Sequence, residues 1–320
     1  MQSVQEFRKN FNNIFFKKIF NMIAPYEQER KRCFVFYSVC LAVLVGSIIL
    51  TYISLMNLNN LPDGMDSDIA FYMSFFPAVI GILLFFIGYS AAKGFELKIK
   101  RIIMPILLRG IEGFIWTERQ TVDDDVIRDA ELIGNYNAVK VDDNFTGEYK
   151  NVGVSISEIE LGEWRYSIVG RNQKTYERKF KGVIVVLYPE KEYKCKILIK
   201  KDGLVDFVPG GLEKVNLEDP EFERKYNVYS NDQIESRYVL TTAFLNRFNN
   251  INLAFDASKI EASIKDSRIV IALSTTKDMF KVGSLHKAVC DYRQFKQLAE
   301  EFASILELID ELKLNQNIGL

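Results

Sequence analysis

The sequence predicts an α+β protein, in which a two-helix transmembrane hairpin precedes a cytosolic domain with a mainly antiparallel sheet and flanking helices. Two uncharged apolar runs within the first hundred residues predict the hairpin. From about Tyr136 the apolar residues change from helical spacing to two-residue alternation, which predicts strands. These strands follow one another and do not alternate with helices, so antiparallel pairing is expected.

The composition excludes several classes of protein. The 320 residues carry 41 Lys and Arg against 42 Asp and Glu, so no overall positive charge attracts nucleic acid. The single histidine, His286, rules out zinc sites with two or more histidine ligands, and we expect it in a solvated loop. The four cysteines lack a C-x-x-C spacing, which indicates reduced thiols. No glycine motif for phosphates or dinucleotides is present, so we expect no cofactor.

Residues 1–32 are expected to form an amphipathic basic helix. Apolar side chains recur at helical spacing and include Phe7, Phe11 and Phe15, while Arg8 and Lys9 occupy other faces. Such a helix can lie on the anionic inner leaflet of a membrane, or it can dock on the protein's own soluble domain. The pattern favours neither alternative over the other.

Residues 33–92 are expected to form the transmembrane hairpin. The segments 33–53 and 69–92 contain no charged residue. At about 1.5 Å per residue, each is long enough as a helix to cross a hydrocarbon core of about 30 Å. Pro77 lies inside the second segment, and helices embedded in lipid tolerate proline when neighbouring groups satisfy the backbone.

The basic residues next to the two spans predict their orientation. The loop 54–68 contains no Lys or Arg. By contrast, basic residues border the outer ends of both spans, namely Arg30, Lys31, Arg32, Lys93, Lys98, Lys100 and Arg101. Because positively charged segments remain in the cytosol, both termini are expected there.

Residues 93–320 are expected to form the cytosolic domain. The apolar pattern of residues 95–116 predicts a helix that is interrupted near Pro105. Strands are predicted at 138–141, 152–161, 178–188, 193–200, 204–208, 253–255, 260–264 and 268–274, and helices at 231–248 and 291–314. Asp202 and Gly203 predict a tight turn before the strand at 204–208. Ser230 and Gln233 predict a capping box at the start of the first of these helices.

One acidic stretch faintly resembles a calcium-binding loop. It contains Asp142, Asn144, Thr146 and Gly147, but Gly153 occupies the position where a bidentate glutamate is needed. The flanking residues also predict strands instead of helices. We therefore expect no metal ligands here, and no arrangement of residues elsewhere predicts a catalytic site.

A more specific pattern runs from residue 217 to residue 241. It reads LEDPEFE at 217–223, YNVYSNDQ at 226–233 and ESRYVLT at 235–241. Together with YNAVKVDDNFTG at 136–147, ISE at 156–158 and FKG at 180–182, it resembles the bacterial membrane family catalogued as domain of unknown function 3137, over most of residues 95–275. The resemblance implies a bacterial plasma-membrane protein with a cytosolic domain, and it implies no catalytic residue, substrate or cofactor. Family members sometimes accompany LemA-like membrane proteins, which is a weak pointer to such a partner.

The same stretch contains a candidate interaction surface, formed by Asp219, Glu221, Asp232, Glu235 and Arg237. In a structural interpretation, the acidic residues lie in the first turn of a helix and the arginine pairs with a carboxylate. In a functional interpretation, they form a polar recognition surface for a partner or a small ligand.

These observations favour a membrane-anchored cytosolic binding or scaffold protein, whose partner is another membrane or peripheral protein. The alternative is an enzyme that acts on a membrane-adjacent substrate through carboxylates such as Asp219, Asp232 and Glu235. That alternative requires the carboxylates to converge in a concave pocket, with at least one of them poised by burial or by a like charge.

Overall fold

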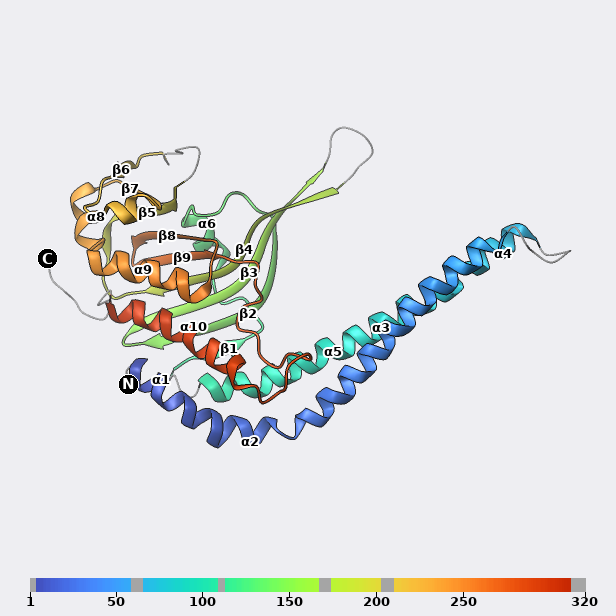
Figure 1. Cartoon of the computed structure of the whole chain (residues 1–320). Coiled ribbons are helices and arrows are strands. Elements are labelled where there is room, and N and C mark those ends of the chain that lie inside the picture. Colours follow the sequence, from blue (N-terminus) through green and yellow to red (C-terminus); the bar gives the residue numbers. More distant parts are fainter. Residues whose placement is uncertain (1–3, 59–65, 109–112, 167–173, 203–209, 312–320) are drawn as a thin grey trace. The chain divides into compact units, whose positions relative to one another are not determined.

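The computed structural model describes residues 4–58, 66–108, 113–166, 174–202 and 210–311 (Figure 1). The chain divides into two compact units. Unit 1 consists of Met1–Ile14, Pro105–Phe280 and Lys296–Leu320, and unit 2 consists of Phe15–Met104 and Lys281–Phe295. Each unit is therefore assembled from segments that lie far apart in the sequence.

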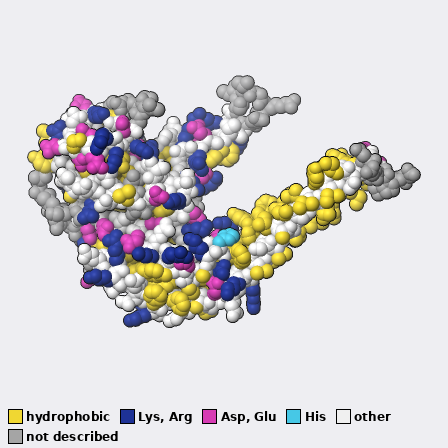
Figure 2. Space-filling model, in the orientation of Figure 1, with side chains coloured by type: hydrophobic (Ala, Val, Ile, Leu, Met, Phe, Trp, Pro, Cys, Tyr) yellow, Lys and Arg dark blue, Asp and Glu magenta, His cyan; other side chains and the backbone are white. Residues whose placement is uncertain are grey.

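In the part of the chain that the structure describes, two helical segments are long and apolar enough to cross a membrane. The first is α3 (Tyr26–Met56), and the second consists of α4 (Ser67–Ser74) and α5 (Phe76–Leu108). Only 11% of the most apolar 18-residue stretch of each segment is buried, and Figure 2 shows hydrophobic side chains along their surface. The break between α4 and α5 places Pro77 in the first turn of α5, where its missing N–H group is tolerated. The expected pair of apolar helices is confirmed.

Small residues allow α3 and α5 to approach each other within unit 2. A Cβ atom added to Gly81 would lie 2.0 Å from Ser47 Oγ, and one added to Gly88 would lie 2.9 Å from the Cβ atom of Cys40. Gly81 and Gly88 lie two helical turns apart and therefore share one face of α5. Apolar helices commonly associate through such small residues, because their backbones can then pack closely.

The loop that follows residue 280 is held to the helices of unit 2 by hydrogen bonds to its backbone. The Leu285 N–H donates to Glu96 Oε1 at 3.2 Å, and the Val289 N–H donates to Glu27 Oε2 at 2.9 Å. Arg30 pairs with Glu27 at 2.7 Å and donates to the carbonyl of Leu285 at 2.6 Å. Arg30, which borders the first apolar run, thus has a structural role in unit 2.

Over the described residues, unit 1 contains a nine-stranded antiparallel sheet. In spatial order its strands are β1 (Ile115–Thr117), β2 (Ala138–Tyr149), β3 (Val152–Tyr166), β4 (Lys174–Tyr188), β9 (Arg268–Ser274), β8 (Lys259–Asp266), β5 (Tyr193–Lys201), β7 (Tyr226–Ser230) and β6 (Glu213–Val215). Strands β2 and β3 are joined by a two-residue turn at Lys150 and Asn151, whose φ values of 50° and 66° suit such a hairpin. The sheet and its flanking helices confirm the predicted α+β class.

Both faces of the sheet are buried, so its central strands are apolar on both sides. On one face, a cluster that includes Ile184 and Val270 packs with α6 (Asp124–Asp129) through Ile127. On the other face, the ring of Phe145 lies 4.7 Å from the ring of Phe302 in α10 (Tyr292–Glu311). This two-sided burial explains the continuous apolar sequences of β4 and β9.

The N-terminal helix α1 (Val4–Ile14) buries its apolar face within unit 1. Phe7 and Phe11 are buried. On the neighbouring side of α1, Arg8 forms ion pairs with Glu300, at 2.9 Å, and with Glu307 of α10. The amphipathic segment was expected either to lie on the membrane leaflet or to dock on the protein's own domain. Residues 4–14 dock on the protein's own domain.

Several predicted elements were wrong in type or extent. The predicted helix at 95–116 ends at Leu108, and Ile115–Thr117 is strand β1, paired with β2. The predicted helix at 231–248 is two helices, α8 (Gln233–Val239) and α9 (Thr242–Phe255), so the predicted strand at 253–255 is the last turn of α9.

The predicted helix cap at Ser230 is wrong. Asp232, and not Ser230, caps α8, because Ser230 is the last residue of β7. The predicted strand at 204–208 lies outside the described residues. The strand before it, β5, pairs over Ile197–Ile199 with β7 on one side and with β8 on the other. The neighbours of β5 in the described sheet therefore come from distant parts of the sequence.

Candidate functional site: an acidic pocket in unit 1

A β-bulge positions the first two carboxylates. In the pairing of β2 with β3, Val141 faces Ile159 and Asn144 faces Ser157, so Asp142 and Asp143 together oppose Glu158. Such an extra residue re-aims the side chains next to it. Asp143 accepts a hydrogen bond from Trp116 Nε1 at 2.8 Å, whereas Asp142 lines a pocket together with Glu158.

The third carboxylate, Asp278, follows the end of β9. The Thr275 N–H donates to the carbonyl of Lys181 at 3.0 Å, and the Met279 N–H donates to Glu158 Oε1 at 2.9 Å. Gly182 permits this approach, because a Cβ atom there would lie 1.9 Å from the carbonyl oxygen of Leu273. The segment that carries Asp278 is thus held on both sides of that residue.

A second buried carboxylate holds the next backbone group. Glu301 of α10 accepts a hydrogen bond from the Phe280 N–H. Phe280 has a φ of 52°, an uncommon conformation for a bulky residue, and its buried ring contacts Phe145 and Phe302. Two consecutive N–H groups, those of Met279 and Phe280, therefore bind to two buried glutamates.

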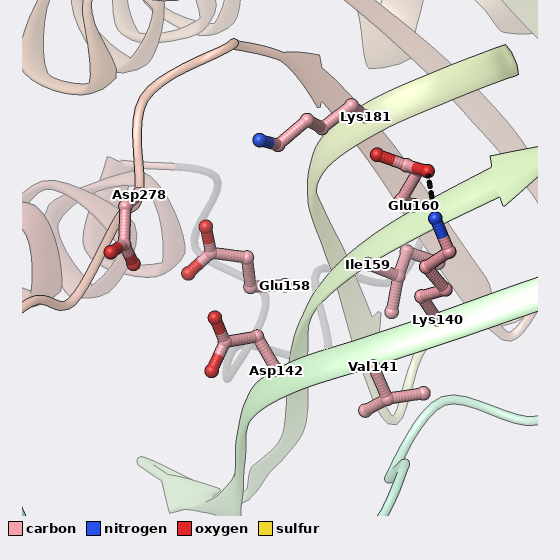
Figure 3. A pocket seen from close by; sticks show the side chains of 8 residues that line it. All are labelled: Lys140, Val141, Asp142, Glu158, Ile159, Glu160, Lys181 and Asp278. Atoms are coloured by element: carbon pink, nitrogen blue, oxygen red, sulfur yellow. Dashed lines mark hydrogen bonds and ion pairs between the residues drawn. The ribbon is translucent and has the colours of Figure 1, made fainter. Parts of the chain in front are cut away.

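Next to these contacts lies an open pocket of about 290 Å³, here called the acidic pocket (Figure 3). The carboxylate oxygens that Asp142, Glu158 and Asp278 direct toward one another lie within 4.8 Å of each other. Lys140 pairs with Glu160 at 2.9 Å on the other side of the pocket. The lining consists of Lys140, Val141, Asp142, Glu158, Ile159, Glu160, Lys181 and Asp278.

Burial makes Glu158 the unusual member of this cluster. It is only 5% exposed, and among the described residues its Oε2 atom has no hydrogen-bond donor. Desolvation raises the pKa of Glu158 to about 9, the Met279 N–H opposes this rise, and the nearby Asp143, Asp142 and Asp278 add to it. Burial and the neighbouring carboxylates therefore both disfavour a negative charge on this group.

Three converging carboxylates are suited to binding a cation. Oxygen ligands are those preferred by hard divalent ions such as Ca²⁺, Mg²⁺ and Mn²⁺. The cluster contains no histidine and no cysteine, which are the usual ligands of zinc. Asp142, Glu158 and Asp278 are thus the residues that could hold a metal.

The sequence drew attention to Asp142 for a different reason. Asn144, Thr146 and Gly147, the other members of the stretch that resembles a calcium loop, are paired residues of β2. The partners of Asp142 are instead Glu158 and Asp278, which the sequence did not single out as ligands. The stretch is a strand, as its flanks predicted.

The predicted interaction residues lie on another part of unit 1. Asp219 caps the short helix α7 (Pro220–Glu223), and its Oδ1 accepts hydrogen bonds from the N–H groups of Glu221 and Phe222 at 3.0 and 3.1 Å. The side chain of Glu221 pairs with Lys225 at 3.0 Å. The predicted inward packing of Phe222 is found, but within a helical turn and not in an extended segment.

The remaining predicted residues belong to α8. Asp232 Oδ1 accepts hydrogen bonds from the N–H groups of Ile234 and Glu235 at 2.9 and 3.0 Å. Arg237 donates to the carbonyl of Asn216 at 3.4 Å and to Gln233 Oε1 at 3.5 Å. Within the described part of the chain, the expected pairing of Arg237 with a carboxylate is not found.

We call the surface formed by the five predicted residues the α7–α8 surface. None of these residues lines the acidic pocket. Two apolar residues of α8 lie among them, Ile234 and Tyr238, which are 70% and 62% exposed.

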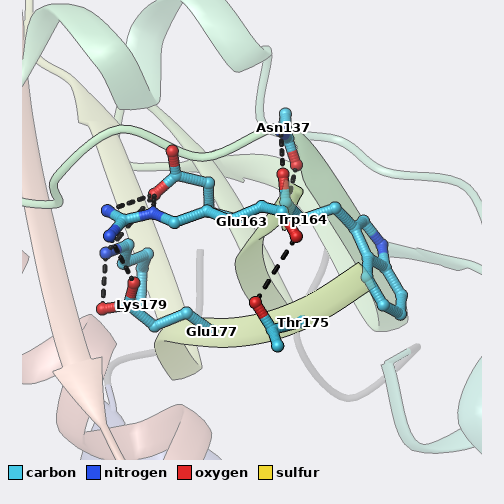
Figure 4. A network of polar contacts seen from close by, with 7 residues as sticks. Asn137, Glu163, Trp164, Thr175, Glu177 and Lys179 are labelled. Carbon is cyan, nitrogen blue, oxygen red and sulfur yellow. Dashed lines mark hydrogen bonds and ion pairs between the residues drawn. The ribbon is translucent and has the colours of Figure 1, made fainter. Parts of the chain in front are cut away.

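A third group of polar contacts braces the outer end of the β3–β4 hairpin (Figure 4). The Asn137 side chain exchanges hydrogen bonds with the backbone of Trp164, at 3.2 Å with its carbonyl and at 2.8 Å with its N–H group. Lys179 pairs with Glu177 at 2.6 Å and with Glu163 at 3.5 Å. These contacts are structural, because Lys179 links β4 to Glu163 of β3 and Asn137 holds the segment before β2 to β3.

Comparison with known proteins gives a family match over part of the chain and no activity. Residues 178–314 match the family described as "Protein of unknown function (DUF3137)". No curated protein matches the chain. The crystal structure of the mycobacterial trehalose monomycolate transport factor A, TtfA, is similar at a TM-score of 0.33 and 11% identity, covering 62% of this chain and 88% of that chain. The family match contains residues 217–241, the most specific part of the resemblance, whereas residues 136–147 lie outside it. Residues 178–314 are therefore similar to the family of proteins of unknown function DUF3137.

Proposed function

We propose that this chain is a membrane-anchored binding protein of the bacterial plasma membrane, whose α+β region faces the cytosol. The observation that carries the proposal is the exposure of apolar side chains along α3 and α5. Val35, Leu50, Phe76 and Phe86 are 57 to 65% exposed. In water, apolar surface costs roughly 25 cal/mol per Å², so a lipid environment accounts for these helices best.

The distribution of charge supports the orientation. Arg30, Lys31 and Arg32 lie in the first turns of α3, and four basic residues follow the apolar part of α5. The described residues of the connecting loop carry no Lys or Arg, and they include Asp66, which caps α4. Because basic residues remain on the cytosolic side, both termini are assigned to the cytosol.

The α7–α8 surface is the proposed contact with a partner. Ile234 and Tyr238 are four residues apart and therefore share one face of α8. Asp232 and Arg237 flank them with charged groups. An exposed apolar centre with a polar rim is the usual anatomy of a protein interface, and aromatic residues such as tyrosine contribute strongly to binding. The proposed partner is another membrane or peripheral protein, and the family resemblance makes LemA-like proteins the first class to test.

Cysteine labelling tests the orientation. In a chain whose four native cysteines are replaced, Asn60→Cys should react with a membrane-impermeant reagent on spheroplasts. Glu190→Cys, at an exposed position of unit 1, should react only after the cells are opened. Reaction of Glu190→Cys in closed cells would show that the orientation is the reverse of the proposed one. Protection of both positions until lysis would contradict the two-span topology.

Site-specific photo-crosslinking tests the binding surface. A photoreactive phenylalanine analogue at position 234 or 238 should capture the same discrete membrane protein, while the analogue at position 190 should not. Deletion of LemA-like genes from the host then tests whether that class supplies the partner. Equal capture at all three positions would count against a specific surface.

A second candidate function is an enzyme that acts on a membrane-adjacent substrate. Asp219 and Asp232, which were named for it, serve as helix caps, and neither they nor Glu235 line the acidic pocket, so the condition stated for these carboxylates is not met. A different set of carboxylates, those of Asp142, Glu158 and Asp278, converges in the acidic pocket and supports this candidate instead. A panel of phosphoester and ester substrates should then be turned over by the full chain and not by Asp142→Asn. Turnover that is equal in both would come from a contaminant.

A further inference from the structure

The acidic pocket carries an observation that an ordinary surface cluster of acids lacks. Glu158 is only 5% exposed, and its Oε1 atom accepts a hydrogen bond from the Met279 N–H. Its Oε2 atom has no donor among the described residues. Figure 3 shows its carboxylate pointing into the pocket, between those of Asp142 and Asp278. A buried carboxylate oxygen without a partner is costly, and a bound cation would offset that cost.

The spacing of the oxygens agrees with a metal ion. Ca²⁺ binds oxygen at about 2.3 to 2.6 Å, so ligands on opposite sides of the ion lie about 4.6 to 5.2 Å apart. The three carboxylates place one oxygen each within 4.8 Å of the others. Mg²⁺ binds oxygen at about 2.0 to 2.1 Å and usually keeps several water ligands, so three protein carboxylates suit it less well than they suit Ca²⁺.

The fold holds the three ligands on separate elements. Asp142 is fixed by the bulge in β2, Glu158 belongs to β3, and Asp278 lies in the segment after β9. That segment is secured by the hydrogen bonds of Thr275 and Met279. A ligand set held by two strands and a braced segment is pre-organised, so little conformational entropy is lost on binding.

We propose that Asp142, Glu158 and Asp278 form a binding site for a hard divalent cation, with Ca²⁺ the best fit. The site goes beyond the proposed function, since neither the membrane anchor nor the α7–α8 surface requires it. A bound ion would connect β2 and β3 to the segment after β9 and so stabilise that part of unit 1.

Two lysines line the same pocket and set its charge. Lys140 is paired with Glu160, which leaves Lys181 as the lysine that competes most directly with a cation. Figure 3 shows the ammonium group of Lys181 directed toward the space beside Glu158. Replacing it with an uncharged side chain should therefore strengthen cation binding.

The test uses the full chain in detergent, treated with a chelator and then titrated with CaCl₂, MgCl₂ or MnCl₂. Thermal unfolding should shift upward with Ca²⁺, by about 5 °C once the ion exceeds its Kd by about a hundredfold. Calorimetric titration should give a stoichiometry of one. Asp142→Asn and Asp278→Asn alter exposed side chains and should weaken binding at least about tenfold. Lys181→Met should tighten it several-fold.

Glu160→Gln is the matched control. It removes one negative charge from the same pocket but not from the three ligands, and it should change the affinity less than about threefold. If none of the three ions shifts the unfolding temperature, or if Asp142→Asn and Asp278→Asn bind as well as Glu160→Gln, the proposal is overturned. Neither result would affect the topology or the crosslinking tests.

Discussion

In the α7–α8 surface, Asp219 and Asp232 each accept hydrogen bonds from backbone N–H groups two and three residues ahead, whereas in the acidic pocket Glu158 binds an N–H group 121 residues away. Asp219 and Asp232 cap the N-termini of the helices that directly follow them. Glu158 instead closes a contact between distant strands and retains an oxygen without a donor among the described residues. Acidic residues that look equivalent in the sequence thus differ in whether local structure satisfies them.

The largest effect on stability is expected at Gly182, where the backbone of β4 closely approaches that of β9 next to the acidic pocket. Gly182→Ala should lower the free energy of unfolding by about 3 kcal/mol or more, because the new Cβ atom would collide with the carbonyl oxygen of Leu273. Thermal unfolding measures the change. The control is Gly153→Ala, whose Cβ atom would lie 3.4 Å from its nearest neighbour and which should cost under about 1 kcal/mol. Equal effects of the two variants would contradict this account.

Glu301→Gln should stabilise the protein in a pH-dependent manner. Desolvation raises the pKa of Glu301 to about 7, from 4.5. The folded state therefore retains a proton that the unfolded state releases, so the free energy of unfolding falls as the pH rises from about 4.5 to 7. The variant removes this loss and should gain about 3 kcal/mol at pH 8 and almost nothing at pH 4.5. Glu218→Gln, at an exposed position, should show no such difference; a gain for Glu301→Gln that is equal at both pH values would refute the titration.

Removing a helix cap should destabilise the protein, in contrast to Glu301→Gln. Asp219→Ala and Asp232→Ala should each lower the free energy of unfolding by about 1 kcal/mol, because two backbone N–H groups lose their acceptor. Asparagine caps helices nearly as well, so Asp219→Asn and Asp232→Asn should stay within a few tenths of a kcal/mol of the original protein. If the asparagine variants lose as much as the alanine variants, the negative charge matters and capping is not the explanation.

The smallest effect on stability is expected at the exposed face of α8. The double variant with Ile234→Ser and Tyr238→Ser should change the free energy of unfolding by less than about 0.5 kcal/mol, since both side chains face solvent. Crosslinking from a third position on α8, such as Glu235, should nevertheless be lost in this variant. A loss of more than about 1 kcal/mol would show that the face packs within the protein.

The sequence predicted the strands that carry a strong apolar pattern. The strand at 268–274 was predicted with its observed bounds, and β3, β4 and β8 were predicted shorter than they are, because their ends are polar. The three-residue strand β1 was missed, since Ile115 and Trp116 continue the apolar spacing of α5 and only the pairing with β2 defines them. The break at Leu240 has no glycine or proline to mark it.

The acidic pocket was beyond the reach of sequence patterns for a different reason. Asp142 and Glu158 meet because of the register of β2 against β3, and Asp278 joins them only after β9 has paired with β4. No spacing of residues encodes such a contact. The residues of the α7–α8 surface could be proposed from the sequence because they lie close together in the chain, and the capping carboxylates among them belong to the local patterns that a sequence does reveal.

The bulge at Asp142 and Asp143 also changes the parity of β2. Directly paired residues project from the same face of a sheet, so Lys140 shares a face with its partner Glu160, and Phe145 shares that same face with its partner Ile156. An even-numbered and an odd-numbered residue of one strand can do so only because an extra residue lies between them. On this single face, β2 is therefore exposed to solvent at Lys140 and buried in the core at Phe145. Deleting one residue at the bulge would turn Lys140 toward the opposite, apolar face, and the pocket and the core could then no longer be built from the same strand.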